Sequence, residues 1–399
     1  MEDTRYIRSL SNGVNQKGVR DHNERLILSL LQRNGEMPGS EIARQTELSA
    51  QTVSVILRKL VGDGLVLKGK PVKGRVGKPS VPIRLNPKGA ATLGCKIGRR
   101  SSEVCLTDLA GNALLERRLH YDIALPKTIF DFIERAVEAA LDALGPLHAA
   151  DLCGIGIAVP FEIWKWGASD GNTPPEFLSW KDVSFPDEVA RFTDLPVFVV
   201  NDATGACWAE HVYGHGREIG HYAYFFVSTF IGGGVVLNRS VYEGPQGNAG
   251  AFGPLRIGDR EGQTRQLLEV ASIHVLESAV AQAGHDPRDL WVQPQNWDAF
   301  APLVDEWIED TAHAMAQACV SVCAVIDFEA MVIDGYFPDD IKARLVDRVR
   351  AYLPLEDSRG LVLPEILPGI VGTNARAIGA ACIPMFAQYF LSAKVLMSD

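Results

Sequence analysis

The chain has 399 residues, 47% of them hydrophobic, which is enough for two or three domains with sizeable cores. Its N-terminus lacks an apolar segment, no apolar run reaches membrane length, and its seven cysteines form no Cys-x-x-Cys pair. These features argue against a secreted or membrane protein, so we expect a cytoplasmic protein with reduced thiols.

The net charge of −10 is unevenly divided. Residues 1–90 hold 16 Lys and Arg against 8 Asp and Glu, whereas residues 91–399 hold 23 against 41. A basic head on an acidic body indicates that a polyanion binds the head rather than the body.

Residues 23–85 have the pattern of a winged helix-turn-helix. The first predicted helix carries apolar residues at helical spacing, namely Leu26, Ile27, Leu30 and Leu31. A break at Gly35 and Pro38-Gly39 precedes a short second helix with Ile42 and Ala43 facing inward.

A third helix is predicted after Ser49, which is a suitable N-cap. Its apolar stripe consists of Val53, Ile56, Leu57 and Leu60, and its opposite stripe of Gln51, Ser54, Val55 and Arg58. Such a face suits a DNA major groove, so we expect contacts from Ser49, Gln51, Thr52, Ser54 and Arg58. The alternative is a three-helix bundle that binds no nucleic acid.

A β-hairpin wing is predicted from residues 65–67 and 81–85. Between them, Gly74-Arg75-Val76-Gly77-Lys78-Pro79 places two cations around a glycine. Arg75 and Lys78 would fit an A·T-rich minor groove, or belong to a flexible basic linker that touches phosphate.

From Ala91 onward, strands and helices alternate. An antiparallel meander is predicted over 92–97, 103–108 and 114–120, followed by a helix (128–144) and strands at 154–159 and 197–200. A second unit follows Asn201-Asp202, with a helix, strands at 222–228, 234–237 and 239–242, helices from Arg265 and Trp297, a strand at 331–333 and a last helix from Asn374. Two such units favour a two-lobed α/β body with a cleft between the lobes.

Across residues 17–390 the chain resembles ROK-family transcriptional regulators, in which a winged helix-turn-helix is joined to a body like a sugar kinase of the actin/hexokinase-like, ribonuclease H-like fold. The motifs that carry the resemblance are Arg20-x-x-Asn23, Ser49-x-x-Thr52-Val53-Ser54, Gly74-Arg75-x-Gly77-x-Pro79, Gly154 to Pro160, Asn201-Asp202-Ala203, Ile231-Gly232-Gly233-Gly234, Gly247-x-Ala249-Gly250 and Gly379-Ala380-Ala381. It implies a DNA-binding domain at 1–90 with its basic wing, a first lobe at 91–200 plus 374–399, and a second lobe at 201–373.

The resemblance also implies an effector site. Asp202 matches the general base of the family's kinases, Asn201 a neighbouring sugar contact, and Glu269 a glutamate that binds sugar hydroxyls. Trp180 lies in the region that walls the sugar cleft, although tryptophans there are also explained by packing. Asn201-Asp202 can equally be a helix N-cap pair.

Several departures argue against catalysis. The family's Asp-x-Gly-Gly-Thr phosphate loop is replaced by Lys96-Ile97-Gly98-Arg99-Arg100, where we expect Arg99 and Arg100 to be surface cations rather than an anion site. The late nucleotide-side Gly-Gly appears as Asp334-Gly335-Tyr336. The family's Glu-x-Gly-His reads Ala251-Phe252-Gly253-Pro254, and its cysteine segment reads 259–265, so we expect no zinc, no cofactor and no kinase activity.

The function expected from these patterns is a DNA-binding transcriptional regulator, a repressor, whose degenerate kinase-like body senses a sugar or polyol. We expect a homodimer or homotetramer on a double-stranded operator. The alternatives are an active sugar kinase with a DNA-binding head, and a constitutive DNA-binding dimer whose body senses nothing.

Overall fold

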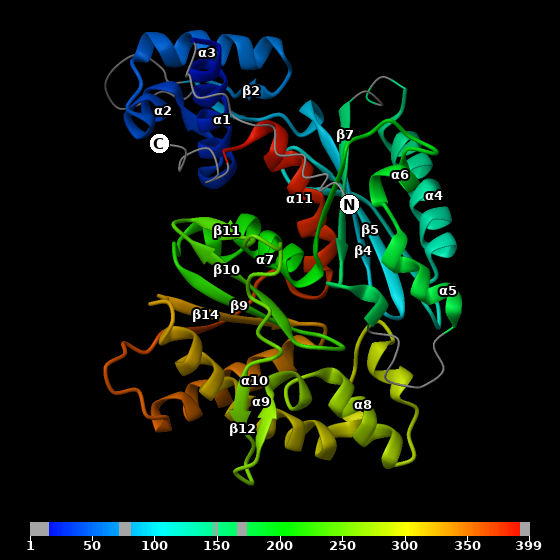
Figure 1. Ribbon diagram of the computed structural model, residues 1–399. Helices are drawn as coiled ribbons and strands as arrows, with labels where there is room; N and C mark the ends of the chain where they lie inside the picture. Colours follow the sequence, from blue (N-terminus) through cyan, green and yellow to red (C-terminus); the bar gives the residue numbers. More distant parts are fainter. Residues whose placement is uncertain (1–15, 72–80, 147, 149–150, 166–173, 392–399) are drawn as a thin grey trace.

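The computed structural model describes residues 16–71, 81–146, 148, 151–165 and 174–391. A small helical head lies at one end, and two lobes follow it in layers, as Figure 1 shows. Within the described residues, no helix is both long and apolar enough to cross a membrane.

The head is a winged helix-turn-helix, as predicted. Its helices are α1 (Gln16–Asn34), α2 (Gly39–Thr46) and α3 (Ala50–Gly62), and its antiparallel sheet has the order β1-β3-β2, formed by Met37–Pro38, Pro82–Leu85 and Val66–Lys68. Ser49 caps α3, because its side-chain oxygen accepts a hydrogen bond from the Thr52 amide at 3.1 Å. The apolar stripe Val53, Ile56, Leu57 and Leu60 is buried, which confirms the predicted inner face.

The first lobe is built on a five-stranded sheet of order β6-β5-β4-β7-β8. The strands are β4 (Ala91–Ile97), β5 (Ser101–Asp108), β6 (Ala113–His120), β7 (Leu152–Val159) and β8 (Val197–Asn201). β4, β5 and β6 form the predicted antiparallel meander, and β7 and β8 add in parallel. The outer side of this lobe carries α4 (Pro126–Leu144), α5 (Pro175–Leu178) and α6 (Phe185–Val189).

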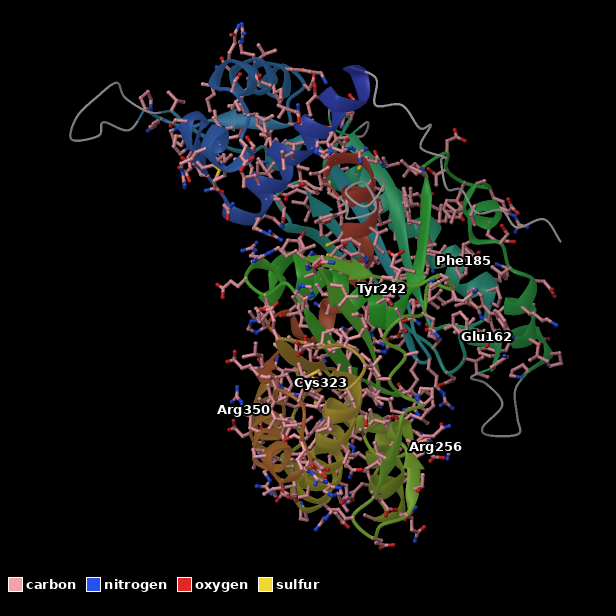
Figure 2. All side chains as sticks on the ribbon, turned by 60° about the vertical axis from the view of Figure 1, so that its left-hand side comes forward. Glu162, Phe185, Tyr242, Arg256, Cys323 and Arg350 are labelled. Carbon is pink, nitrogen blue, oxygen red and sulfur yellow. The ribbon has the colours of Figure 1, made fainter. Side chains whose placement is uncertain are left out.

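The second lobe repeats this arrangement with the order β11-β10-β9-β14-β15. Its strands are β9 (Tyr222–Val227), β10 (Gly232–Leu237), β11 (Ser240–Tyr242), β14 (Ala330–Gly335) and β15 (Glu365–Pro368). The outer layer holds α8 (Ile273–Gln282), α9 (Ala301–Cys323) and α10 (Asp339–Tyr352). Figure 2 shows Cys323 and Arg350 in this layer, at the end of the molecule away from the head. The predicted pair of repeated α/β units is therefore present.

One predicted helix is wrong. Residues from Arg265 do not begin a helix, because Thr264–Gln266 form strand β13, which pairs with β12 (Arg256–Gly258). The hairpin turn explains this: Asp259 Oδ1 accepts from the backbone of Glu261 and Gln263, and Gly262 has a φ of +81°. The helix that follows, α8, starts only at Ile273.

Two helices, α7 (Asp202–Tyr213) and α11 (Ala375–Tyr389), lie between the sheets. Glycines permit the close packing of α11 on its neighbours: a Cβ on Gly156 of β7 would lie 1.8 Å from the Ala380 carbonyl oxygen, and one on Gly379 would lie 1.7 Å from the Gly205 carbonyl oxygen of α7. α11 packs on both the first sheet and α7. The predicted division into a first lobe (91–200 plus 374–399) and a second lobe (201–373) therefore stays a proposal, as does the predicted limit of the head at residue 90.

The head is joined directly to these two helices. Met385 of α11 and Phe390, which directly follows this helix, belong to the same buried cluster as Ile27 and Leu31 of α1. Gln32 donates a side-chain hydrogen bond to the carbonyl of Val212 in α7 at 3.2 Å. The Leu391 amide donates to Ser29 Oγ at 2.8 Å. The first helix of the head therefore contacts the ends of both central helices.

Candidate effector pocket and nucleic-acid interface

The third helix of the head presents a polar outer face. Gln51, Ser54 and Arg58 are exposed, and the Arg58 Nε donates to the Ser54 carbonyl at 3.3 Å. Ser49 and Thr52 are occupied with each other, since their hydroxyl oxygens are 2.8 Å apart at the helix start. Arg75 and Lys78 of the wing lie outside the described residues. The exposed face of α3 therefore consists of Gln51, Ser54 and Arg58, and the Ser49–Thr52 pair caps the start of the helix.

A cavity of ≈ 670 Å³ lies between the two lobes. Its walls come from the first-lobe loops after β4 and β7, from the start of α7, and from β9 and β10 of the second lobe. Apolar side chains form much of the wall, namely Ile123, Phe161, Ile163, Phe177, Phe226, Phe230, Ile231 and Leu268. A mostly apolar cleft of this volume with a few polar groups is typical of a small-molecule site.

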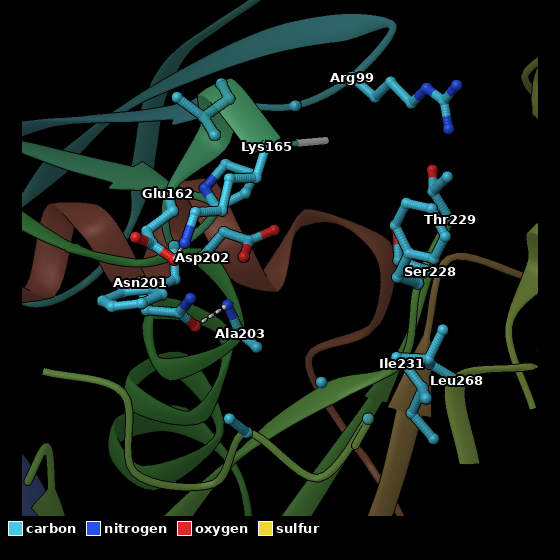
Figure 3. Close-up of a pocket in the computed structure, with 18 of the residues that line it drawn as sticks. Arg99, Glu162, Lys165, Asn201, Asp202, Ala203, Ser228, Thr229, Ile231 and Leu268 are labelled. Carbon is cyan, nitrogen blue, oxygen red and sulfur yellow. Dashed lines mark hydrogen bonds and ion pairs between the residues drawn. The ribbon is translucent and has the colours of Figure 1, made fainter. Parts of the chain in front are cut away.

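Asn201 and Asp202 stand at the corner where β8 turns into α7, and both line the cavity. Asn201 caps the helix, because its Oδ1 accepts from the amides of Ala203 and Thr204 at 3.0 and 3.2 Å (Figure 3). Asn201 is therefore a helix cap that also lines the pocket, and its contact with an effector stays a prediction.

Asp202 is ion-paired with Arg376, which is the second residue of α11. Arg376 Nη1 donates to Asp202 Oδ2 at 3.2 Å, and the two side chains are 7% and 20% exposed. The guanidinium also lies over the Phe226 ring, 5.1 Å from its centroid. One ion pair thus links the starts of the two central helices at the pocket wall.

At the outer side of the pocket, Lys165 donates to Glu162 Oε2 at 2.7 Å, so these two charges neutralise each other. Figure 3 shows Glu162 and Lys165 on the same side as Asn201 and Asp202, with Arg99 and Thr229 across the opening. The pocket therefore has charged or hydroxyl groups on both of its walls.

Two of the predicted effector contacts are not brought to this pocket. Trp180 is buried in the first-lobe core, where it stacks on Phe185 and donates its Nε1 hydrogen to the Ala124 carbonyl. Glu269 accepts from the Gln266 amide in a capping box, and its side chain is 48% exposed. Trp180 supports the wall from behind through Ala124, a lining residue, whereas Glu269 is turned outward beside the lining residue Leu268.

The segment Lys96 to Arg100, which was predicted to replace a kinase phosphate loop, is folded inward. Lys96 is 3% exposed and pairs with Glu103 at 3.5 Å, and Arg118 reaches the same carboxylate at 3.3 Å. Arg100 bonds to Glu277 of the second lobe, and Arg99 lines the pocket. Arg99 and Arg100 are half-buried between the lobes, so the expectation that they are surface cations is corrected: residues of the second lobe cover this loop.

Both members of the buried Lys96–Glu103 pair have shifted pKa values. Burial, followed by the neighbouring charge of Arg376, lowers the pKa of the Lys96 ammonium to about 8. Burial alone would raise the pKa of Glu103, but Lys96, Arg376 and Arg118 outweigh it and lower the pKa of that carboxyl. Burial is therefore the main cause of the lowered Lys96 pKa, whereas neighbouring cations are the cause of the lowered Glu103 pKa.

The sequence did not predict Arg376 or the buried Lys96–Glu103 pair as residues of the site. A usable signal for Arg376 was present, since it is the one charged residue in an otherwise small and apolar final helix, Ala375–Tyr389. Within the described residues, no group of three or more His, Cys, Asp or Glu side chains is placed to hold a metal ion.

A winged helix-turn-helix head on a two-lobed body with a pocket between the lobes defines a DNA-binding transcriptional regulator. Comparison with known proteins agrees: the model of the ROK family matches residues 92–384, and a winged helix-turn-helix DNA-binding model matches residues 20–66. The chain belongs to the ROK family.

Some relatives match this chain over both its head and its two-lobed body. It is 28% identical to the uncharacterized protein y4fQ of Sinorhizobium fredii, over 93% of this chain and 92% of that protein. It is 26% identical to the xylose repressor of Bacillus spizizenii, over 61% of this chain and 62% of that protein, so that match spans less than two thirds of either. A crystal structure of a ROK-family transcriptional regulator, described as a homologue of the Escherichia coli MLC protein, shares the fold with a TM-score of 0.65 and 20% identity, over 93% of this chain and 97% of that one.

Proposed function

We propose that this protein is a cytoplasmic repressor that binds a sugar or polyol between its lobes and thereby changes its affinity for an operator. The observation that carries the proposal is the course of the two central helices. Both α7 and α11 begin at the pocket, where Asp202 pairs with Arg376, and both end against α1 of the head. A change at the pocket therefore has a short, packed route to the DNA-binding domain.

A ligand that bridges the two lobes would change their separation, because the pocket takes its walls from both. The Asp202–Arg376 pair and the tight glycine contacts hold α7 against α11. For closure to move these helices, the ion pair and the glycine contacts have to shift together, as they do when helices move as rigid bodies. A coupling of about 1–3 kcal/mol between ligand and operator is enough to change DNA affinity roughly 5- to 150-fold.

On DNA, α3 would lie in the major groove with Gln51, Ser54 and Arg58 toward the bases. Ser49 and Thr52 would contribute through the helix start, and Arg75 and Lys78 of the wing would follow a minor groove or the phosphates. Two heads in a homodimer or homotetramer would then read two half-sites of one operator.

Phosphoryl transfer is not part of the proposal. Asp202, which matches the kinase general base, accepts a hydrogen bond from Arg376, and Lys96 occupies the place of the phosphate-loop aspartate. Tyr336 lies at the matching nucleotide side, where its ring packs on Trp291 with centroids 5.2 Å apart. The Arg376 contact of Asp202 hinders proton abstraction, Lys96 hinders metal binding, and Tyr336 hinders nucleotide entry. The protein, given ATP, magnesium and a panel of hexoses, should therefore yield no ADP above background.

The test combines operator selection with ligand screening. A duplex would be selected from random DNA with the full-length protein, and the protein would then be screened by thermal shift against sugars, polyols and their derivatives. The hits should change the operator dissociation constant at least fivefold. Hits that stabilise the protein but leave DNA binding unchanged would favour the constitutive alternative, and ADP production lost in Asp202→Ala would favour the kinase.

A further inference from the structure

We infer that the effector is an uncharged glycoside whose apolar aglycone packs on the second-lobe side of the pocket. The aglycone, an aromatic or alkyl group, would lie on an apolar wall formed by Ile231, Ala251, Pro254 and Leu268. The sugar hydroxyls would face Asn201 and Asp202 at the start of α7. This inference rests on the proposed function and narrows the chemical class of its ligand.

The charged side chains that line the pocket are balanced in sign. Among the described lining residues, three are cationic and three are anionic, namely Arg99, Lys165 and Arg376 against Asp122, Glu162 and Asp202. Two pairs are in direct contact, since Lys165 donates to Glu162 at 2.7 Å and Arg376 donates to Asp202 at 3.2 Å. An ionised ligand would find no surplus of opposite charge among these residues and would lose its hydration on entry. The balance favours an uncharged ligand.

The apolar wall is one continuous surface of the second lobe. A Cβ on Gly253 would lie 2.9 Å from the Ile231 carbonyl oxygen and 3.3 Å from the Leu268 Cβ. The loop from Ala251 to Pro254 therefore lies directly against both residues. Ala251 and Pro254 are exposed and Leu268 is half-buried, although all three line the pocket. Apolar surface that remains in contact with water inside a cleft is typical of a place where a ligand packs.

Contacts behind the wall hold it in position. The ring of Phe252 packs on that of Phe225 with centroids 4.6 Å apart, and the Leu268 amide donates to the Gly253 carbonyl at 2.9 Å. Gly250 has a φ of +83°, and a Cβ on it would lie 2.6 Å from the Gly234 Cα. Because the surface is already ordered, a ligand that covers it loses little free energy to ordering the protein.

Hydrogen-bonding groups face this wall from the start of α7. Figure 3 shows Asn201 and Asp202 on one side of the pocket, and Ile231 and Leu268 on the other. The two sides meet at Ala203, whose Cβ would lie 2.9 Å from a Cβ on the neighbouring glycine of β10. A ligand at this point therefore has polar groups on one side and apolar groups on the other.

The pocket has room for more than a monosaccharide. Its volume of ≈ 670 Å³ lies within the range that holds drug-sized ligands. Ser228, Thr229 and Asn248 add hydrogen-bonding side chains on the second-lobe side, so a sugar ring can be bound from both lobes. A free hexose that filled the pocket would place hydroxyls against the apolar wall, and polar groups without partners are costly there. An apolar aglycone fits this wall instead.

Matched glycosides and the full-length protein provide the test. Methyl and phenyl glycosides of glucose, galactose, mannose and xylose would be compared in both anomers by calorimetry, with phenol as a further probe. We expect at least one phenyl glycoside to bind tenfold or more tightly than its methyl counterpart, because its ring takes apolar surface out of water. Its binding should have a more negative heat capacity change. Its affinity should differ less than twofold between low and high salt, because the ligand is uncharged.

Two changes in the apolar wall should reduce this preference. Leu268→Asn keeps a side chain of similar size but makes it polar, and Ala251→Gln adds an amide at an exposed position where the core is not disturbed. Each should lower the ratio of phenyl to methyl affinity to about threefold or less. The matched control is Leu355→Asn, which changes a leucine that is 77% exposed and is not among the described residues lining the pocket. That variant should keep the full ratio.

Equal affinities of methyl and phenyl glycosides, or a ratio that survives both wall variants, would overturn the inference while the sugar-sensing proposal stands. A carboxyphenyl glycoside that binds tenfold more tightly than the phenyl glycoside would contradict an uncharged ligand. Phenol that binds as tightly as the phenyl glycoside would contradict a glycoside. If no probe binds and the wider ligand screen also yields no hit that alters operator affinity, the sensing function itself fails, and the inference with it.

Discussion

Asp202 and Arg376 are 174 residues apart in the chain, yet their side chains form an ion pair of 3.2 Å at the wall of the interlobe pocket. Asp202 begins α7 and Arg376 lies in the first turn of α11. The ion pair therefore links α7 and α11, the two helices that run from the pocket to the DNA-binding head. It also occupies the carboxylate that the family resemblance predicts to match a kinase general base.

Breaking this pair from one side should destabilise the protein. Asp202→Asn leaves the buried Arg376 without a counter-ion, so we expect its unfolding free energy to drop by about 2–4 kcal/mol. The double variant Asp202→Asn/Arg376→Gln should recover more than 1 kcal/mol of the summed single losses, because neither charge is then left alone. Urea unfolding of the four proteins measures this coupling, and strictly additive losses would show that the pair is energetically unimportant.

DNA recognition should depend on Arg58. Its side chain is exposed on the outer face of α3, so Arg58→Ala should weaken binding to the selected operator by roughly 5- to 150-fold. The matched control is Arg260→Ala, which removes one exposed cation from the second lobe, where it pairs with Asp310. Gel shift on operator and on scrambled DNA separates base reading from a general loss of charge. Equal losses in the two variants would move recognition away from α3.

Communication between pocket and head should depend on the contacts of α1. Ser29→Ala and Gln32→Ala together remove the hydrogen bonds to Leu391 and Val212 without touching the pocket or α3. We expect ligand affinity and ligand-free operator affinity to stay within about twofold, while the effect of ligand on operator binding shrinks. Gln45→Ala, on the exposed side of α2, is the control. An unchanged ligand effect in the double variant would place the coupling elsewhere.

Acid sensitivity should arise in part from His211 of α7. Burial, and then the charge of Arg33 in the head, lower the pKa of this imidazole from its ordinary 6.5 to about 4. As the pH falls from 6.5 toward 4, the unfolded chain takes up a proton that the folded protein does not, so the unfolding free energy declines. The contribution is about 2 kcal/mol at pH 5.

Comparing wild type with His211→Gln tests this contribution. The difference in unfolding free energy between pH 7 and pH 5 should be smaller in the variant by about that amount. His120→Gln, which removes an exposed histidine, should behave like the wild type. A wild-type pH profile that is preserved in His211→Gln would mean that the folded protein protonates this residue freely.

Several parts of the structure follow from local sequence. The Ser49 cap, the stripe from Val53 to Leu60 and the hairpin wing rest on spacing and turn chemistry within a few residues, and all were predicted correctly. The repeat of two α/β units was visible because each buried strand carries its own apolar run. Where hydrogen bonds to a turn decide the outcome, as in β13, apolar spacing predicted a helix that is not there.

The position of each side chain at the pocket was decided only by tertiary structure. Asn201 and Asp202 reach it because β8 ends at the cleft, whereas Trp180 and Glu269, which the family resemblance placed there, pack into a core and cap a turn. Arg376 comes to Asp202 only through the packing of α11 on α7 at Gly205 and Gly379. Spacing along a chain determines which face of a helix or strand a residue occupies, but contact between distant elements depends on how closely their surfaces fit, and that is a property of the folded molecule.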